Sequence, residues 1–223
     1  MLPQPIPTEY SMTKRGLFIT IEGVEGVGKS TNLAFIESLL AAQEIPFITT
    51  REPGGTPLAE KIRDLLLDKN NIEMTDITEL MLVFAARAQH VSMLIEPALA
   101  RGEWVICDRF TDSTYAYQGG GRNMSFDLIK QIDEVALNHY QPDITLLLDL
   151  PIDVGLERAS QRGELDRFER ESIDFFNRVR DTFLHRANLE PGRFGLIDAG
   201  KSLDNVQVSI RAAIEQAIEG WRK

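Results

Sequence analysis

The chain has 223 residues, 43% of them hydrophobic, which is enough for one domain with a sizeable core. Its 24 Lys and Arg against 34 Asp and Glu give a net charge of −10, which argues against a nucleic-acid partner, because such proteins carry a basic footprint. A single cysteine rules out an internal disulfide, and no apolar run approaches the roughly 20 residues of a membrane span. We therefore expect a cytoplasmic protein without a membrane partner.

The predicted elements begin after a flexible N-terminal tail, residues 1–15, in which proline alternates with polar residues. From residue 16 to residue 223 we expect a single domain. Within it, short and nearly continuous apolar runs are typical of strands buried on both faces of a parallel sheet. These predicted strands are Leu17–Glu22, Pro46–Thr50, Trp104–Asp108, Ile144–Leu150 and Arg193–Asp198.

Longer stretches with helical periodicity separate the strands. They predict helices at Lys29–Ala42, Leu58–Leu67, Asp76–Ala100, Phe126–His139, Ile152–Arg162, Glu169–Ala187 and Leu203–Trp221. Pro97 predicts a kink or an early end in the third of these. The alternation indicates an α/β fold, an open parallel sheet of about five strands with helices on both faces. Ligands of such sheets bind at the carboxyl ends of the strands, so functional motifs should follow the first three strands.

A phosphate-binding loop follows the first predicted strand. The string "GVEGVGKS", residues 23–30, fits G-x-x-x-x-G-K-[ST] and lies between a strand and a helix, as this motif requires. The loop backbone and the helix start would cradle phosphates, Lys29 would reach the β- and γ-phosphates, and Ser30 would bind Mg²⁺. The ligand is thus ATP or GTP with magnesium. The predicted nucleotide-binding residues are Gly23, Val24, Glu25, Gly26, Val27, Gly28, Lys29, Ser30 and Thr31.

The third strand ends in "DRF", which points to a second phosphate. Two strands end in an aspartate that could serve Mg²⁺, Asp108 and Asp149, but only Asp108 is followed by an arginine, Arg109. Arginine grips phosphate through two parallel hydrogen bonds, although a strand-end ion pair is the plainer interpretation of an Asp-Arg pair alone. The chain has no N-K-x-D string to read guanine, which disfavours a GTPase switch.

Several further strings resemble bacterial thymidylate kinases, which are P-loop nucleoside monophosphate kinases. The resemblance runs from about Gly16 to the C-terminus, and it is carried by "REPGGTPLAEKIRDLLL", "FAARAQH", "CDRFTDSTYAYQGGGR" and "ERASQRGELDRFERE". It implies a P-loop NTPase-type fold that transfers the γ-phosphoryl group of ATP to dTMP, giving dTDP and ADP. It also implies a homodimer, for which the apolar stretch from Met81 to Leu99 is a candidate interface.

The resemblance also implies an acceptor site. Arg109 would grip the dTMP phosphate near Asp108, and Tyr117 would lie against the sugar, where its bulk excludes a ribose hydroxyl. Arg87 would donate to a thymine carbonyl. Many relatives stack thymine on a phenylalanine four residues before this arginine; here the phenylalanine, Phe84, stands three before it. Both spacings lie on one helix face, so Phe84 is a predicted thymine contact, with a core position as the alternative interpretation. The remaining implied contacts are Arg51, Glu52, Pro53, Arg63, Thr114 and Gln118.

An arginine-rich segment, residues 158–170, resembles the lid of the lid-arginine type of thymidylate kinase, whose P-loop lacks an arginine. Its candidate catalytic residues are Arg158, Arg162 and Arg167. An arginine on a closing lid would neutralise the transferred phosphoryl group and exclude water. A solvated charged connection is the plainer interpretation of such a run.

Glu25 places a carboxylate inside the phosphate-binding loop. Because it would repel the triphosphate, we expect its side chain to face the acceptor, where the resemblance supplies the 3′-hydroxyl of dTMP. Two alternatives stay open at this stage. A P-loop deoxynucleoside kinase, or another small-molecule kinase, would need Glu25 or Glu52 as a base. A nucleotide-dependent interaction protein would need no second phosphate grip.

Overall fold

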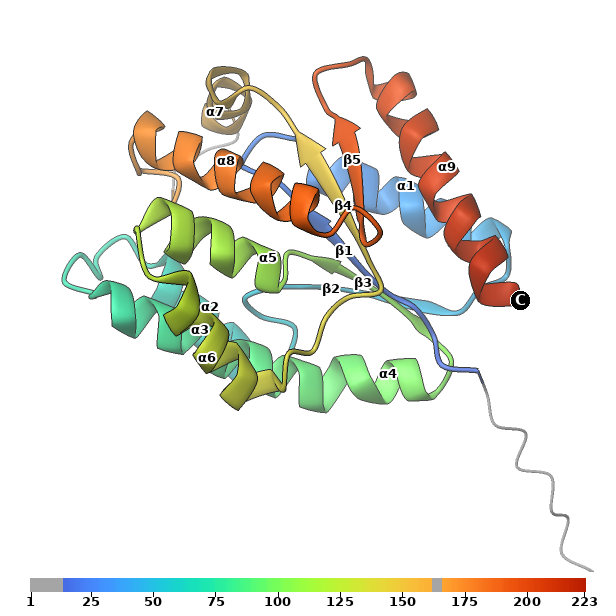
Figure 1. Ribbon diagram of the computed structural model, residues 1–223, viewed down its shortest axis with the longest axis horizontal. Helices are drawn as coiled ribbons and strands as arrows, with labels where there is room; N and C mark the ends of the chain where they lie inside the picture. Colours follow the sequence, from blue (N-terminus) through green and yellow to red (C-terminus); the bar gives the residue numbers. More distant parts are fainter. Residues whose placement is uncertain (1–13, 162–165) are drawn as a thin grey trace, which may run out of the picture.

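A five-stranded parallel sheet forms the centre of the computed structural model, which describes residues 14–161 and 166–223. The strands lie in the order β2-β3-β1-β4-β5 (Figure 1). They are β1 (Phe18–Glu22), β2 (Phe47–Arg51), β3 (Trp104–Asp108), β4 (Ile144–Asp149) and β5 (Phe194–Asp198). The five predicted strands are thus confirmed to within one residue at each end.

The inner strands β1, β3 and β4 are buried, which explains their continuous apolar runs, whereas the edge strands β2 and β5, which we also expected to be buried, are partly exposed. In β3, Trp104 and Ile106 belong to a core cluster that includes side chains of the helices α1 (Lys29–Ala42) and α9 (Leu203–Arg222). The alternate residues Val105 and Cys107 pack in a second cluster with the helices η1 (Val91–Ile95) and α4 (Glu96–Ala100). Burial raises the pKa of the Cys107 thiol, so this cysteine packs as an unreactive side chain.

Helices cover the two faces of the sheet in Figure 1. The longer ones are α1 (Lys29–Ala42), α2 (Pro57–Leu67), α3 (Asp76–His90), α6 (Phe126–Leu137), α7 (Ile152–Ser160), α8 (Ile173–Leu189) and α9 (Leu203–Arg222). The shorter ones are η1 (Val91–Ile95), α4 (Glu96–Ala100), α5 (Thr111–Thr114) and η2 (Tyr115–Gly121). No helix within residues 14–161 and 166–223 is long and apolar enough to cross a membrane.

The helices differ from their predicted extents where proline, caps and glycine intervene. The stretch 76–100 does not end before Pro97 but passes through a π-helical segment, η1, which precedes that proline. α8 begins at Ile173 instead of Glu169, because the Ser172 hydroxyl accepts a hydrogen bond from Phe175 N and caps the helix. The helical segment of α5 and η2 was not predicted at all.

The predicted N-terminal tail lies largely outside the described residues. Arg15, which we assigned to the tail, is described and anchored. Its guanidinium contacts the Asp143 carboxylate at 2.8 Å, and its carbonyl accepts a hydrogen bond from Trp221 Nε1 at 2.8 Å. The ordered domain therefore begins before residue 16.

Asp112 on α5 links that short helix to the far end of α8. The carboxylate is fully buried and pairs with Arg186 of α8 and with Arg193, next to β5. Burial by itself would raise the pKa of Asp112, but the hydrogen bonds and charges of the two arginines outweigh it and hold the pKa below its usual value. The network fixes the base of the segment that carries the site residues.

We expect Asp112→Ala to lower the free energy of unfolding by about 3–5 kcal/mol, because it leaves two buried arginine charges without their carboxylate. The matched control is Glu190→Ala, which removes a 42% exposed partner of the same arginines and should cost at most about 1 kcal/mol. Denaturant unfolding measures both. Since the folded pKa of Asp112 is depressed, its contribution is complete above about pH 4 and is lost as the pH falls. Equal losses in the two variants would contradict this account.

Candidate active site

The loop between β1 and α1 has the geometry of a phosphate cradle. Gly28 adopts a left-handed conformation (φ 89°) directly before α1. Gly26 (φ 75°) approaches the Gly155 backbone so closely that an added Cβ would lie 1.9 Å from the Gly155 carbonyl oxygen. Lys29 Nζ donates to the carbonyl oxygens of Gly23 (3.1 Å) and Val24 (3.0 Å). Its burial and the nearby Arg109 charge lower the pKa of Lys29 to about 8.

A cavity of about 280 Å³ opens beside the cradle, at the carboxyl ends of β1, β2 and β3. The motifs that follow these strands meet there, which is the arrangement that the predicted topology requires. Of the predicted site residues, the following line it: Glu25, Gly26, Gly28, Lys29, Ser30, Arg51, Glu52, Pro53, Arg63, Arg87, Asp108, Arg109, Thr114, Tyr117 and Gln118.

Four predicted nucleotide contacts do not line this cavity. The side chains of Val24 and Val27 are buried in the main core cluster, so only their backbone groups can serve phosphates. Thr31 is exposed on α1. Gly23 is buried at the start of the loop, and its carbonyl oxygen accepts a hydrogen bond from Lys29 Nζ. These positions fit a cradle built mainly from backbone N–H groups.

Glu25 lies between two residues of the acceptor side. Its Oε1 accepts from Arg109 Nη2 at 2.9 Å, and Tyr117 OH lies 2.7 and 2.8 Å from its two oxygens. The Arg109 guanidinium also stacks over the Tyr117 ring at 4.8 Å. The Glu25 carboxylate therefore points toward the predicted acceptor residues.

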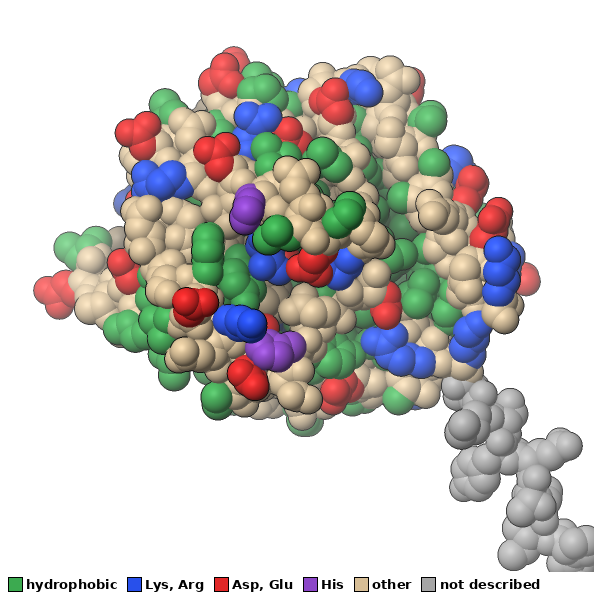
Figure 2. Space-filling view, in the orientation of Figure 1, with side chains coloured by type: hydrophobic (Ala, Val, Ile, Leu, Met, Phe, Trp, Pro, Cys, Tyr) green, Lys and Arg blue, Asp and Glu red, His purple; other side chains and the backbone are tan. Residues whose placement is uncertain are grey.

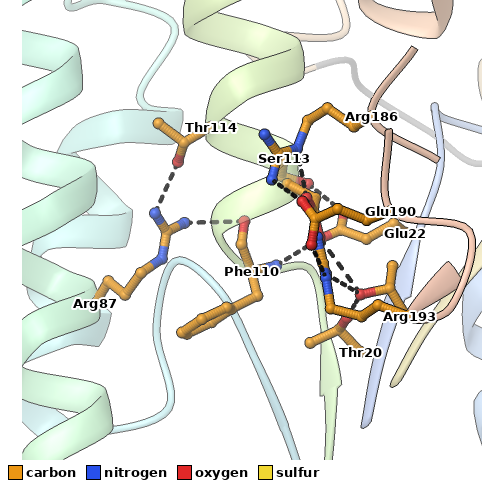
Figure 3. A network of polar contacts seen from close by, with 11 residues as sticks. Thr20, Glu22, Arg87, Phe110, Ser113, Thr114, Arg186, Glu190 and Arg193 are labelled. Atoms are coloured by element: carbon orange, nitrogen blue, oxygen red, sulfur yellow. Dashed lines mark hydrogen bonds and ion pairs between the residues drawn. The ribbon is translucent and has the colours of Figure 1, made fainter. Parts of the chain in front are cut away.

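Glu22 holds the strained backbone that carries Arg109. Arg109 has φ 72°, a left-handed value that is uncommon for a residue other than glycine. The next residue, Phe110, donates its N–H to Glu22 Oε1 at 2.7 Å, and Ser113 Oγ donates to Glu22 Oε2 at 2.6 Å (Figure 3). Complete burial, with a contribution from the Asp112 charge, raises the pKa of Glu22 to about 7. Glu22 was not among the predicted site residues.

A chain of buried hydrogen bonds runs from β2 to α5. Glu52 Oε1 contacts His90 Nδ1 at 2.9 Å, and Glu52 Oε2 accepts from Arg87 Nε. Arg87 in turn donates to Thr114 Oγ1 at 2.8 Å and to the Phe110 carbonyl oxygen at 3.1 Å (Figure 3). Both carboxylate oxygens of Glu52 are thus engaged, which disfavours Glu52 as a general base. His90 has a structural role and completes the support of Arg87.

The prediction for Phe84 is wrong in its orientation. Phe84 is 2% exposed and packs with Leu80 and Ile129 in a separate core cluster under α3. The cavity is lined instead by Val83, which is four residues before Arg87 and shares its helix face. Phe84 supports Arg87 through a cation–π contact, because the Arg87 guanidinium lies 5.3 Å from the centre of the Phe84 ring.

The lid arginines are only partly described. Arg158 is exposed on α7, and Arg162 lies outside the described residues. Arg167 donates to the Leu66 carbonyl oxygen at 2.8 Å and pairs with Glu79 at 2.6 Å. The guanidinium of Arg167 is thus committed to a buried carboxylate of α3, and the cavity wall beside it is formed by Asp166, Phe168 and Glu169. This position corrects the expectation that Arg167 faces the transferred phosphoryl group.

Asp108 has the features expected of a magnesium ligand. Its Oδ1 is buried without a hydrogen-bond partner in the described part of the chain, and it lines the same cavity as Ser30. The competing aspartate, Asp149, is held by Arg180 Nε and Nη2 at 2.7 and 2.9 Å. A carboxylate and a hydroxyl suit Mg²⁺, which binds few protein ligands and keeps several waters. The residues present therefore fit this ion.

Comparisons with known proteins agree with this geometry. The family model described as thymidylate kinase matches residues 21–210. The thymidylate kinase of Pseudomonas syringae pv. tomato is 54% identical over 204 residues, which cover 92% of this chain and 97% of that protein. The thymidylate kinase of Teredinibacter turnerae is 56% identical, with 90% and 98% covered.

A solved structure shows the same similarity in three dimensions. The crystal structure of thymidylate kinase from Ehrlichia chaffeensis has a TM-score of 0.72 and 32% identity, covering 90% of this chain and 99% of that one. Sequence and fold therefore agree, and the resemblance inferred from the motifs is confirmed. The chain belongs to the thymidylate kinase family.

Proposed function

We propose that the chain transfers the γ-phosphoryl group of ATP to dTMP, giving dTDP and ADP. The observation that carries the proposal is that one cavity holds both the cradle lysine, Lys29, and a separate arginine, Arg109, paired with Glu25 and Tyr117. A hydrolase or a switch needs the first group only. Two phosphate grips at one cavity are what a kinase of a phosphorylated acceptor requires.

The reaction needs positioning and charge neutralisation more than proton transfer. The acceptor is a phosphate monoester that is ionised at neutral pH, so no strong base is required. Arg109 binds the acceptor phosphate, and Lys29 binds the phosphates of ATP. Ser30 and Asp108 would hold Mg²⁺, which would supply neutralisation of the phosphate charge when bound. Arg158 and Arg162 remain the proposed lid contributors, and Arg51, Pro53 and Arg63 line the acceptor side.

The acceptor pocket also accounts for selection of deoxyribonucleotides over ribonucleotides. We place the Tyr117 ring beside C2′ of the sugar and the Glu25 carboxylate at the 3′-hydroxyl. The two side chains fix each other's position, because Tyr117 OH donates a hydrogen bond to the Glu25 carboxylate. A ring fixed in this way leaves no room for a ribose hydroxyl, and steric rejection discriminates more strongly than a merely apolar pocket.

We expect Glu25→Gln to raise KM for dTMP by about 10- to 100-fold, because it removes a charge-assisted hydrogen bond to the acceptor and loosens Arg109. KM for ATP should stay within about twofold, since the side chain faces away from the cradle. Steady-state kinetics with each substrate varied in turn separate the two. The control is Glu37→Gln on α1, whose carboxylate accepts from Thr49 away from the cavity. A rise in KM for ATP alone would contradict the placement of Glu25.

A coupled ADP-release assay over nucleosides and nucleoside monophosphates tests the proposed function. We expect robust turnover with dTMP and little with thymidine. Strong activity with thymidine and none with dTMP would favour a deoxynucleoside kinase with Glu25 as its base. Failure of the ATP-free protein to bind dTMP in equilibrium dialysis, together with no turnover, would favour a nucleotide-dependent interaction protein.

We also propose a homodimer that works in the cytoplasm, without nucleic-acid or membrane partners. Large apolar side chains of α2, α3 and η1 are about half exposed or more: Leu58, Leu65, Ile77, Met81 and Met93. The interface that we predicted from residue 81 to residue 99 cannot extend to its last residue, because the side chain of Leu99 is buried.

On the described face that Figure 2 shows, Lys and Arg are interspersed with Asp and Glu without an extended basic patch. Light scattering after size exclusion tests the dimer.

A further inference from the structure

Glu79 is a buried carboxylate to which the phosphoryl-transfer chemistry gives no role. It lies on α3 with 1% exposure, accepts three hydrogen bonds and forms a further ion pair. Oε1 accepts from Gln118 Nε2 at 2.8 Å and from Arg122 Nε at 3.3 Å, and Oε2 accepts from Arg122 Nη2 at 3.2 Å. Arg167 Nη1 pairs with Oε2 at 2.6 Å. The negative charge of Glu79 is therefore the counterion of two arginines. Between two permanent cations this carboxylate is an acceptor only.

An acceptor-only neighbour decides which way the Gln118 side chain faces. A carboxamide has a donor end and an acceptor end at the tip of one planar group. Only the NH₂ end can meet the Glu79 carboxylate, so the carbonyl oxygen lies on the other side of the plane. Gln118 lines the cavity, so the carbonyl oxygen is the polar atom left for a ligand there. Arg87, which lines the same cavity, presents only donors.

We propose that Glu79 is a positioning residue that sets base specificity, by holding the Gln118 carboxamide with its carbonyl oxygen toward the bound base. The inference rests on the proposed function and adds a residue to it. The pocket then offers a donor from Arg87 beside an acceptor from Gln118. That order matches the O4 acceptor and the N3–H donor of thymine.

Cytosine carries the reverse pattern on the same edge. Its N3 is an acceptor and its 4-amino group is a donor, so it would set acceptor against acceptor at Gln118 and donor against donor at Arg87. Buried polar groups that face like groups are left unpaired, and this is how a hydrogen-bonding site rejects a close analogue. A Gln118 side chain that was free to flip would lose half of this discrimination. Glu79 prevents the flip.

The decisive measurement compares Glu79→Gln with Glu171→Gln. Each replacement removes one carboxylate from the same arginine, Arg122, but Glu171 makes no contact with Gln118 among the interactions of the described residues. We expect Glu79→Gln to lower the ratio of kcat/KM for dTMP to that for dCMP at least about 10-fold, and Glu171→Gln to leave it within about twofold. An unchanged ratio in Glu79→Gln, or the same shift of the ratio in both variants, would overturn the proposal. A residue with a purely structural role would lower kcat/KM for dTMP and for dCMP by the same factor.

A swapped pair keeps the proposal testable if the single variant folds poorly. In Glu79→Gln/Gln118→Glu the donor and the acceptor exchange places while the net charge is kept, and the second oxygen of residue 118 is again an acceptor. We expect this variant to recover preference for dTMP over dCMP; a folded variant with no recovery counts against the proposal.

The unmodified protein adds a test, because it should bind dUMP, which keeps N3–H, better than dCMP. Equal binding would overturn the proposal. Absence of dTMP turnover in the unmodified protein would instead overturn the proposed function itself.

Discussion

Replacement of Arg109 by alanine should reduce kcat/KM for dTMP by about 1000-fold or more, the largest effect that we expect from a single change. The guanidinium is the only charged group that the structure bonds at once to Glu25 Oε1, at 2.9 Å, and to the Gly23 carbonyl oxygen, at 3.0 Å, among the described residues. It therefore lies at the boundary between the cradle and the acceptor. Its loss removes both the grip on the acceptor phosphate and positive charge beside the transferred group.

The matched variant Arg109→Lys separates charge from geometry. Lysine keeps the positive charge but presents a single ammonium in place of a planar fork, so we expect an intermediate loss, about 10- to 100-fold. Steady-state kinetics and equilibrium binding of dTMP should be measured on all three proteins. Near-normal dTMP affinity and turnover in Arg109→Ala would show that the acceptor phosphate binds elsewhere.

The second large effect is expected for Lys29→Met, which should lower turnover about 100- to 1000-fold with every acceptor, because the lost charge belongs to the ATP side. In contrast to Arg109→Ala, dTMP binding should be nearly unchanged. The pKa of about 8 leaves most of the Lys29 ammonium charged at neutral pH, ready for phosphate.

Stability measurements distinguish this result from misfolding. Burial disfavours the Lys29 ammonium in the nucleotide-free cradle, so an apolar side chain of similar length should not lower Tm. The exposed Lys130 on α6 provides the control Lys130→Met, which should leave activity unchanged. A Lys29→Met protein that retained full turnover would contradict the assignment of the phosphate-binding loop.

Much of the fold could be predicted because its physical causes are local. A parallel strand buried on both faces must be apolar nearly throughout, and β3 shows this in all but its last residue. The helix of α5 and η2 could not be predicted, since three successive glycines indicate a loop. Those glycines are required by packing: an added Cβ at Gly120 would lie 2.1 Å from Thr182 Oγ1 on α8. That contact is distant in the sequence, so the local pattern conceals it.

The candidate site divides in the same way. Residues in the segments that follow strands, such as Lys29 at the start of α1 and Arg109 directly after β3, are identified by motif and by topology together. Supporting residues are not, because Glu22, Glu79 and His90 are buried polar groups whose partners come from other elements. One signal was present. Glu79, Val83 and Arg87 are spaced four apart on a single helix face, which places a carboxylate on the face whose residues Val83 and Arg87 line the cavity.

The ion pair between Glu25 and Arg109 has a consequence for how the first substrate is received. Before dTMP arrives, the guanidinium already has a carboxylate partner at 2.9 Å. Binding of the acceptor phosphate is then an exchange of one anionic partner for another, and little bare positive charge is exposed to attract mobile anions from solution. Affinity for dTMP should accordingly depend less on ionic strength than the number of arginines around the cavity implies. We therefore expect the Glu25 carboxylate to compete with inorganic phosphate for the Arg109 guanidinium until dTMP binds.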